Sequence, residues 1–361
     1  MNYFNEQEIQ ELKASFDEGS FYYPKILKLT LLEKCNWRCL MCSCNKTAAP
    51  QLKKEDWLKI VKDGINLGVS EINFTGGEPT LFPDFIGIIE GIRKLDPEHK
   101  IKLKILSNAT RFKKSTVSKY LELGINRYII SLHSASPKIH DQIVGIPKQW
   151  FKTYTGINNL MSTKPEIYRS LWINCVVQKS NFNELPKMIE IAHNLGCEGI
   201  SFSPIDNRVT ATGASEALNM EEMNIFYKTV IPQLQERSDH YNIMLYPKSL
   251  KLFGDTFEEV VASTQGILSR NYYKNHPCYW VYYHLTIEPN GTVQPCCNKP
   301  LQNGYGNAIT TSLKDILSND KVKDFLRFSK NGPHGNSSCK GCEMKLEINK
   351  NIHTTFQSLK V

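Results

Sequence analysis

Three cysteines with short, regular spacing stand near the N-terminal end of the chain: Cys35, Cys39 and Cys42. Three thiolates can hold three irons of a cubane cluster and leave the fourth iron open, whereas a structural zinc site needs a fourth protein ligand. Cys44 lies close enough in the sequence to be that fourth ligand. Spacing alone therefore leaves two interpretations, an iron–sulfur cluster with an open position or a closed zinc site.

A glycine-rich sequence, Gly76-Gly77-Glu78-Pro79, directly follows a run of β-forming residues at 70–75. Two adjacent glycines let the backbone approach a ligand closely, and the glutamate carboxylate can receive an ammonium group. Alone, this sequence also fits an ordinary tight turn between a strand and a helix. Its place after a strand that follows the cysteine triplet favours the binding interpretation.

A second set of cysteines lies in the last quarter of the chain, at Cys278, Cys296, Cys339 and Cys342. Four thiolates can close either a zinc site or a [4Fe–4S] cluster, and their spacing does not separate these two possibilities. Cys297 is next to Cys296 and is an alternative ligand at that position.

The composition is that of a globular protein. The chain has 361 residues, of which 41% are hydrophobic and 22% charged, which excludes a disordered or collagen-like protein. No apolar run has the length of a membrane helix and the N-terminus has no signal-peptide core, so we expect a cytoplasmic protein with reduced thiols. Its net charge of +8 mildly favours an anionic partner or substrate, although a solvated basic surface is the simpler interpretation.

Six β-rich runs alternate with helical patterns up to Pro204. Such alternation predicts parallel βαβ units with right-handed crossovers, and with no obvious return strand it predicts an open partial (β/α)6 barrel of the α/β class. The predicted strands cover residues 26–32, 70–75, 101–106, 127–133, 170–177 and 199–204. The predicted helices cover residues 6–16, 55–67, 84–94, 115–123, 151–161 and 183–195.

After Pro204 the alternation stops. A polar stretch leads to one long predicted helix at 220–236, and Asn290-Gly291 between two β-runs predicts a hairpin, because both residues tolerate positive φ. We therefore predict four parts: an N-terminal helical extension (1–24), a barrel core (25–205), a linker with a bridging helix (206–240) and a small C-terminal α+β domain (241–361) that carries the second cysteine set.

The CxxxCxxC sequence from Cys35 to Cys42, the GGEP sequence, Ser107-Asn108 and Ser131-Leu132-His133 together resemble the radical S-adenosylmethionine (radical SAM) enzymes over roughly residues 25–205. The resemblance implies that Cys35, Cys39 and Cys42 bind a [4Fe–4S] cluster whose open iron is chelated by SAM. In that family an electron from the reduced cluster cleaves SAM to methionine and a 5′-deoxyadenosyl radical, which abstracts a substrate hydrogen.

The resemblance also implies contacts with SAM. The matching positions lie at or near the ends of successive predicted strands: Gly76, Gly77, Glu78, Asn108, Ser131, Asn174 and Ile200. The first three would meet the methionine amino group, the next two the ribose or carboxylate, and the last two the adenine and ribose. Two positions depart from the family pattern. Met41 stands where an aromatic residue is usual, and Ser107-Asn108-Ala109 replaces the frequent Thr-Asn-Gly.

The second cysteine set, with Gly291 before Cys296, resembles the first part of the SPASM auxiliary-cluster domain. The remaining cysteines of that motif are missing, because residues 343–361 contain none, so the shortened version resembles a twitch domain. It implies an auxiliary [4Fe–4S] cluster held by Cys278, Cys296, Cys339 and Cys342. The expected cofactors are thus two [4Fe–4S] clusters and SAM, with flavodoxin or ferredoxin as reductant and no membrane or nucleic-acid partner.

Three functional hypotheses follow. The first is oxidation or epimerisation of a carbon in a small hydroxylated molecule, such as a sugar or aminoglycoside, with Cys297 or Cys44 as the possible hydrogen donor of an epimerase. The second is modification of a ribosomally made peptide by crosslinking or epimerisation. The segment before the first predicted strand is too short for the leader-binding module of many such enzymes. This second hypothesis is therefore less favoured than the first. The third, a non-catalytic zinc-binding protein, is disfavoured because both core motifs are intact.

Overall fold

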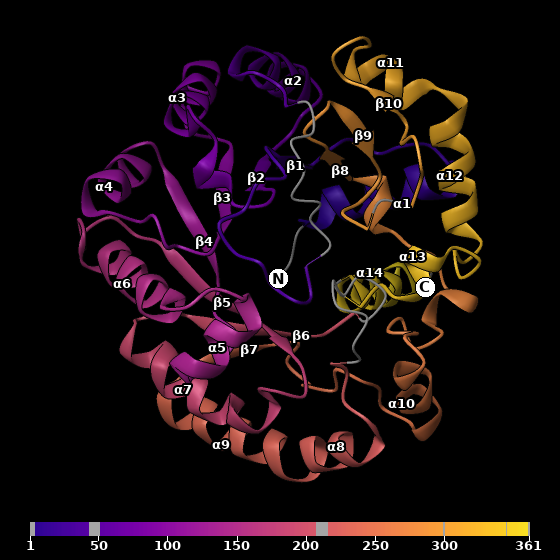
Figure 1. The fold of residues 1–361 in the computed structure, drawn as a ribbon. Helices are drawn as coiled ribbons and strands as arrows, with labels where there is room; N and C mark the ends of the chain where they lie inside the picture. Colours follow the sequence, from indigo (N-terminus) through magenta and orange to yellow (C-terminus); the bar gives the residue numbers. More distant parts are fainter. Residues whose placement is uncertain (1–3, 43–50, 207–215, 299, 344, 360–361) are drawn as a thin grey trace.

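One ten-stranded sheet runs through the protein in a computed structural model that describes residues 4–42, 51–206, 216–298, 300–343 and 345–359. The strands lie in the order β10-β9-β8-β1-β2-β3-β4-β5-β6-β7 (Figure 1). Their bounds are β1 Ile26–Thr30, β2 Glu71–Thr75, β3 Lys102–Ser107, β4 Ile125–Ser131, β5 Ser170–Val177, β6 Gly199–Pro204, β7 Met244–Tyr246, β8 His284–Ile287, β9 Thr292–Gln294 and β10 Gly306–Asn307.

The sheet is an open partial barrel, as the sequence predicts. Strands β1 to β7 are parallel, and β8 joins the other side of β1 in parallel before β9 and β10 turn back antiparallel. Figure 1 shows the strands β1 to β7 as an arc with helices outside it and the C-terminal elements across the opening. The two edges, β7 and β10, do not pair with each other.

The helices have the bounds α1 Glu6–Glu18, α2 Lys54–Asn66, α3 Phe85–Leu95, α4 Lys114–Glu122, α5 Pro137–Val144, α6 Gln149–Ser162, α7 Leu185–Asn194, α8 Met220–Ile225, α9 Ile231–Tyr241, α10 Phe257–Thr264, α11 Leu313–Ser318, α12 Asp320–Lys330, α13 Ser337–Lys340 and α14 Leu346–Ser358. Of these, α2, α3, α4, α6, α7 and α9 lie outside the arc (Figure 1). None of the helices in the described residues is long and apolar enough to cross a membrane.

The alternation of side chains along each strand decides what faces the helices. In β5, Leu171 and Ile173 are fully buried in the main core, while Trp172 and Asn174 between them are only partly buried. Successive side chains of a strand point to opposite faces. The apolar set therefore packs under the helices, and the intervening set faces the concave side of the barrel.

Four features differ from the sequence-based expectation. A seventh parallel strand, β7, pairs with β6, and helix α5 lies between β4 and β5. Both are too short to produce a clear periodic pattern. The predicted hairpin (β8 and β9) is not a separate sheet, since β8 extends the barrel sheet beside β1. The predicted long helix is present as α8 and α9, joined by a π-helical turn at Phe226–Val230.

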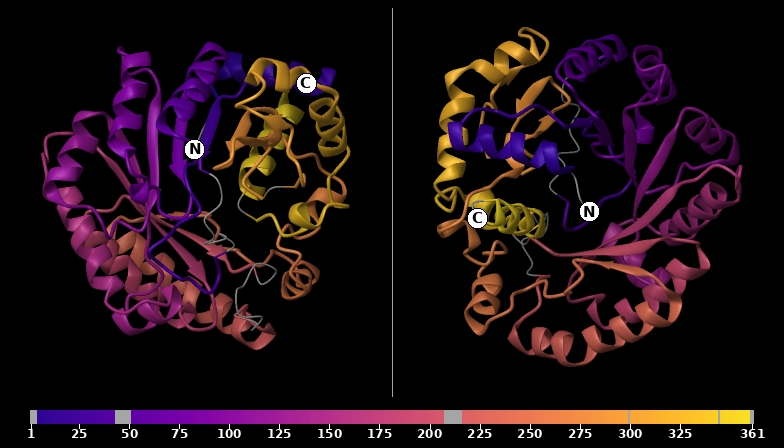
Figure 2. Two further views of the ribbon diagram at one scale, coloured as in Figure 1. Left: turned by 45° about the horizontal axis from the view of Figure 1, so that its top comes forward. Right: turned by 180° about the vertical axis from the view of Figure 1, so that it is seen from behind.

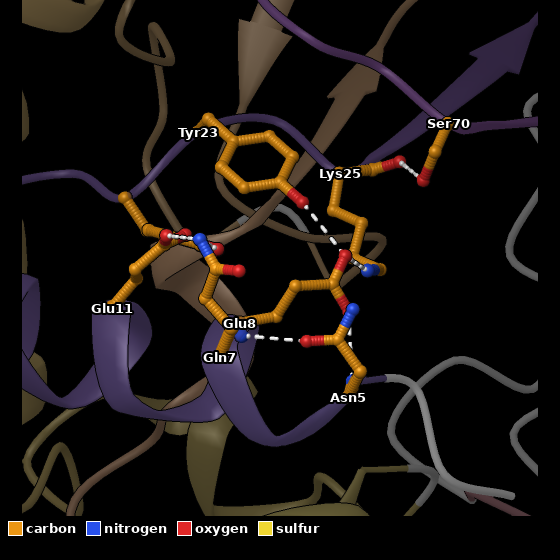
Figure 3. Close-up of polar contacts among 8 residues, drawn as sticks. Asn5, Gln7, Glu8, Glu11, Tyr23, Lys25 and Ser70 are labelled. Atoms are coloured by element: carbon orange, nitrogen blue, oxygen red, sulfur yellow. Dashed lines mark hydrogen bonds and ion pairs between the residues drawn. The ribbon is translucent and has the colours of Figure 1, made fainter.

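Helix α1 is fastened to the start of β1 by polar contacts (Figure 3). The Glu8 carboxylate forms an ion pair with Lys25 and accepts a hydrogen bond from the Tyr23 hydroxyl at 3.2 Å. Asn5 caps the helix by accepting a hydrogen bond from the Glu8 N–H at 2.9 Å, which satisfies one of the free donors of the first turn. These contacts fix α1 against the chain that enters the barrel.

The other side of α1 contacts the C-terminal part of the chain. The Phe16 ring lies 4.8 Å from the Tyr279 ring, 5.3 Å from Tyr282 and 5.9 Å from Phe356, measured between centroids. The Lys330 ammonium donates to the carbonyls of Phe16 and the next residue. Figure 2 shows α1 beside the C-terminal elements in both views. Helix α1 therefore joins the barrel core to the region that holds the second cysteine set.

We expect Phe16→Ala to lower the free energy of unfolding by about 2 kcal/mol, because it removes a partly buried ring that packs against three aromatic neighbours. Chemical denaturation of the full chain measures this change. Phe257→Ala is the matched control, since that ring is 70% exposed. Equal losses in the two variants would contradict the bridging role of α1.

Candidate active site

The residues singled out in the barrel gather where the parallel strands end. The cysteine loop follows β1, the glycine pair follows β2, Asn108 follows β3, and Ser131 ends β4. Ligands of open α/β sheets bind outside the carboxyl ends of the strands, because loops from several neighbouring strands meet there. The topology therefore places these loops around one edge of the sheet.

Helix α5 holds the cysteine loop by its backbone. The Arg38 N–H donates to the Val144 carbonyl at 2.9 Å, and the Leu40 N–H donates to the Ile143 carbonyl at 3.2 Å. Gly145 ends this helix with φ +68°, and a Cβ there would stand 2.7 Å from the Arg38 carbonyl oxygen. The cysteine loop is thus held, on both sides of Cys39, by a helix that follows it by about a hundred residues.

Trp37 anchors the same loop by its side chain. The ring is buried, its Nε1–H donates to the Gln149 Oε1 at 3.1 Å, and it meets the His140 ring edge-on with centroids 5.2 Å apart. The Trp37 backbone N–H donates to the Cys35 sulfur at 3.3 Å. Hydrogen bonds to cluster sulfurs influence reduction potential, so this contact would matter to a cluster bound there.

The glycine pair lies against the chain's own backbone. A Cβ on Gly76 would be 2.4 Å from the Leu32 carbonyl oxygen, and one on Gly77 would be 2.2 Å from that of Lys34. The Gly77 N–H donates to the Leu32 carbonyl at 2.7 Å, and the Glu78 N–H to the Lys34 carbonyl at 3.0 Å. The two glycines are therefore required by the segment that leads into the cysteine loop, whatever ligand they also meet.

Glu78 is buried and fully engaged. Its Oε1 accepts from the Ser107 hydroxyl at 2.8 Å and from the Thr80 hydroxyl and N–H at 2.6 and 3.2 Å, and its Oε2 accepts from the Asn108 N–H at 2.8 Å. Burial raises the pKa of this carboxyl, and the hydrogen bonds oppose that rise. In this arrangement the carboxylate ties the end of β2 to the end of β3.

The Asn108 side chain connects the next loop to the cysteines. Its Nδ2–H donates to the Asn36 Oδ1 at 2.8 Å, and its Oδ1 accepts from the Thr110 hydroxyl at 2.7 Å. Asn36 in turn donates to the Thr110 hydroxyl at 2.8 Å. Asn108 is buried and positions the cysteine loop, while its contact with SAM stays a prediction.

Ser131 and Asn174 are neighbours on the concave face, because they are paired in register between β4 and β5. Ile200 behaves differently. It is fully buried in the main core and pairs with Ile173, whose side chain faces the helices, so the side chain of Ile200 does not reach the concave face. Ser201, paired with Asn174, is the residue of β6 on that face. The SAM contacts of these positions stay predictions.

His133 and His140 are buried next to the Trp37 ring of the cysteine loop. Of the two, only His133 lies in a motif that the sequence analysis singled out. The His133 N–H donates to the His140 Nδ1 at 3.1 Å, and the two rings are stacked with centroids 5.9 Å apart. Burial lowers the pKa of each ring to about 3, so both are neutral at physiological pH. Sequence patterns do not indicate that His140 and the rest of α5 support the cysteine loop, because these contacts join segments that are distant in the chain.

The second cysteine set surrounds a small cavity. Cys278, Cys296, Cys339 and Cys342 all line it, together with Lys345 and several apolar side chains. Burial raises the pKa values of the Cys296 and Cys342 thiols, and the charges of neighbouring cysteines, Cys297 among them, add to the rise. A bound metal centre would supply the positive charge that keeps such thiols deprotonated.

Within the described residues no three His, Cys, Asp or Glu side chains are arranged to hold a single metal ion. Thiols placed around a cavity suit a four-iron cluster, which takes one thiolate per iron. Cys297 is half-buried beside Cys296, with its sulfur 3.8 Å from the Asn298 Oδ1, and it is not among the residues lining the cavity. Cys44 lies outside the described residues.

Comparison with known families agrees with this geometry. The radical SAM superfamily model matches residues 29–192, and the model of the SPASM iron–sulfur cluster-binding domain matches residues 278–343. The chain therefore carries a radical SAM domain followed by a SPASM iron–sulfur cluster-binding domain. The two matches imply one [4Fe–4S] cluster with SAM in the barrel and a further iron–sulfur cluster in the C-terminal region.

Curated relatives resemble mainly the barrel. A probable GTP 3′,8-cyclase from Saccharolobus islandicus is 29% identical over 176 residues, which is 48% of this chain and 54% of the relative. A second probable GTP 3′,8-cyclase, from Sulfurisphaera tokodaii, is 28% identical over 62% of this chain and 70% of its own length. The chain spans about half the length of the first of these curated relatives.

Solved structures resemble nearly the whole chain. Streptococcus suis SuiB bound to the precursor peptide SuiA has a TM-score of 0.65 and 18% identity, covering 93% of this chain and 75% of SuiB. The structure of anSMEcpe with bound AdoMet has a TM-score of 0.64 and 17% identity, covering 93% of each chain. At these identities the likeness shows a shared fold.

We expect Gly77→Ala to destabilise the loop after β1 and to lower the iron content after anaerobic reconstitution, because the added methyl group would overlap the Lys34 carbonyl. Iron analysis and thermal unfolding measure the two effects. Gly335→Ala is the control, since a Cβ there meets no atom within 4 Å. Normal iron content and stability in Gly77→Ala would contradict the backbone role of this glycine.

Proposed function

We propose that this enzyme reductively cleaves SAM and uses the resulting radical to abstract a hydrogen from a carbon of a small hydroxylated molecule, which is then oxidised or epimerised. The observation that carries the first part is the cysteine loop, held between the glycine pair after β2 and helix α5. When bound, the two clusters and SAM would supply a hydrogen-abstracting 5′-deoxyadenosyl radical and an acceptor for the electron that an alcohol oxidation releases.

The residues of the chain prepare this site in three ways. Cys35, Cys39 and Cys42 would hold the barrel cluster, and Trp37 and α5 fix their loop. The glycine segment, Ser131 and Asn174 would meet SAM at the strand ends. Cys278, Cys296, Cys339 and Cys342 would hold the auxiliary cluster, because they line one cavity.

Modification of a ribosomally made peptide is the second candidate. It is favoured by the likeness to SuiB, whose structure holds its precursor peptide SuiA and resembles 93% of this chain. The relatives named as probable GTP 3′,8-cyclases favour a small anionic substrate instead. Incubation with cell extract separated by size decides between the two, because substrate-dependent consumption of SAM will follow either the peptide or the small-molecule fraction.

We expect the triple variant Cys35→Ala, Cys39→Ala and Cys42→Ala to form no 5′-deoxyadenosine with dithionite and SAM, while it retains about four irons per chain in the auxiliary site. Chromatography of the products and iron analysis of the same sample provide the test. Cys197→Ala is the control, because that thiol is buried in the main core. SAM cleavage by the triple variant would disprove the assignment of the barrel cluster.

We expect Cys339→Ala combined with Cys342→Ala to lower the iron content by about four per chain and to leave some SAM cleavage that is not coupled to substrate turnover. Cys296→Ala should lose the same iron, and Cys297→Ala should retain it, since only the first of this pair lines the cavity. Iron, sulfide and zinc analysis measures the outcome. Unchanged iron with loss of one zinc would contradict an auxiliary cluster.

A further inference from the structure

A single row of polar side chains crosses the concave face of the sheet. Residues paired in register on neighbouring strands point to the same face. The row, which we call the concave-face row, runs over six strands from β9 to β4: Gln294, Thr286, Lys28, Asn73, Lys104 and Arg127. On the alternate positions of these strands, apolar residues such as Leu27, Ile72 and Ile105 are fully buried in the main core.

One carboxylate serves two of the cations in this row. The Glu71 Oε1 lies 2.7 Å from the Lys104 ammonium, and its Oε2 lies 2.8 Å from the Arg127 guanidinium. Burial alone would raise the pKa of Glu71, but the two cations outweigh it and lower the pKa. This group of three side chains therefore already carries one net positive charge.

Two further lysines add to that charge. Within the described residues, neither Lys28 nor Lys345 has a carboxylate at ion-pair distance; the Lys345 ammonium instead lies 4.0 Å from the centroid of the Trp280 ring. The Trp280 ring packs on the His284 ring with centroids 4.6 Å apart. Burial and the charges of Lys345, Lys28 and Lys104 lower the pKa of His284, so the three ammonium groups act on a ring that is neutral.

Three polar atoms of the row are buried and have no hydrogen-bond partner among the described residues: Asn73 Oδ1, Thr286 Oγ1 and Gln294 Oε1. Each of these residues is less than one-tenth exposed. The amide nitrogen of Gln294 is already used, donating to the Leu301 carbonyl at 2.9 Å. Buried polar atoms are costly unless they find partners, and these three could accept hydrogen bonds from hydroxyl groups.

The row lies between the two cysteine sets. Lys28 and Asn73 each stand two residues before the end of their strand, so the row is about 7 Å below the edge where the cysteine loop and the glycine pair meet. Lys345 lies on the side of the second cysteine set, because it lines that cavity, and its ammonium stands over the Trp280 ring that packs on His284. A substrate bound to the row would thus have the cysteine loop of the barrel on one side and the second cysteine set on the other.

We propose that the concave-face row binds a substrate with an anionic group, a carboxylate or a phosphate, held by Lys28 and Lys345, and with hydroxyl groups that donate to Asn73, Thr286 and Gln294. The excess of lysines favours a substrate with negative charge. The unpartnered oxygens favour a substrate whose hydroxyl groups can donate hydrogen bonds to them. This inference rests on the proposed function, whose substrate class it narrows from hydroxylated molecules to hydroxylated anions.

Isothermal titration calorimetry of the reconstituted holoenzyme tests the inference with three probes: pyrophosphate, tartrate and the uncharged erythritol. We expect pyrophosphate or tartrate to bind, erythritol to bind much more weakly, and Lys28→Met and Lys345→Met each to raise Kd at least tenfold. Preference for pyrophosphate would identify the anion as a phosphate, and preference for tartrate as a carboxylate.

Lys62→Met is the matched control, since Lys62 is exposed on α2, and its Kd should stay within twofold of the wild-type value. Lys28→Arg should bind nearly as tightly as the wild type, because it keeps the positive charge. This variant separates loss of charge from misfolding of Lys28→Met. No binding of either anion, or an equal loss in Lys62→Met, would overturn the inference. Formation of 5′-deoxyadenosine by the wild-type protein is measured in parallel; its absence would contradict the proposed function and leave the binding comparison intact.

Discussion

The contact between the glycine pair and the backbone before the cysteine loop is the constraint on which the barrel site depends. Gly76 and Gly77 lie so close to the carbonyls of residues 32–34 that no side chain fits at either position. Hydrogen bonds from the same segment to Leu32 and Lys34 fix where the chain leaves β1. Because Cys35 directly follows Lys34, this contact largely sets the position of the first of the three thiols.

Helix α5 completes the support from the opposite side. Its last carbonyls receive the N–H groups of Arg38 and Leu40, and its residues pack on the Trp37 ring. A preformed loop avoids part of the ordering cost that a flexible loop would incur when a cluster binds. The buried Glu78 adds a further tie between the second and third strand ends.

The continuity of the sheet links the two cysteine sets. Strand β8 pairs directly with β1, and it follows Cys278 and precedes Cys296 in the chain. The C-terminal region is therefore joined to the barrel by more than chain connectivity, because it shares backbone hydrogen bonds with the first strand of the barrel and aromatic contacts with α1. This arrangement gives the concave face side chains from both regions, with Lys28 from one and Thr286 and Gln294 from the other.

The sequence by itself determined the chemistry and the order of the elements. Local patterns can be recognised without knowledge of the fold. Such patterns are the spacing of Cys35, Cys39 and Cys42, the GGEP sequence and the alternation of strands and helices. It also indicated the four cysteines of the second set. The part played by α5 could not be predicted, since its contacts with the cysteine loop join segments about a hundred residues apart.

Only the tertiary structure decided which residues share a face. Register between strands places Lys28 beside Asn73 and Thr286, and it turns Ile200 toward the helices while Ser201 faces inward. A shift of one residue in pairing would exchange the two faces, so no single strand sequence fixes these neighbours. The glycine pair makes the same point, because its sequence indicates a close approach and only the fold shows that the approaching group is the chain's own backbone.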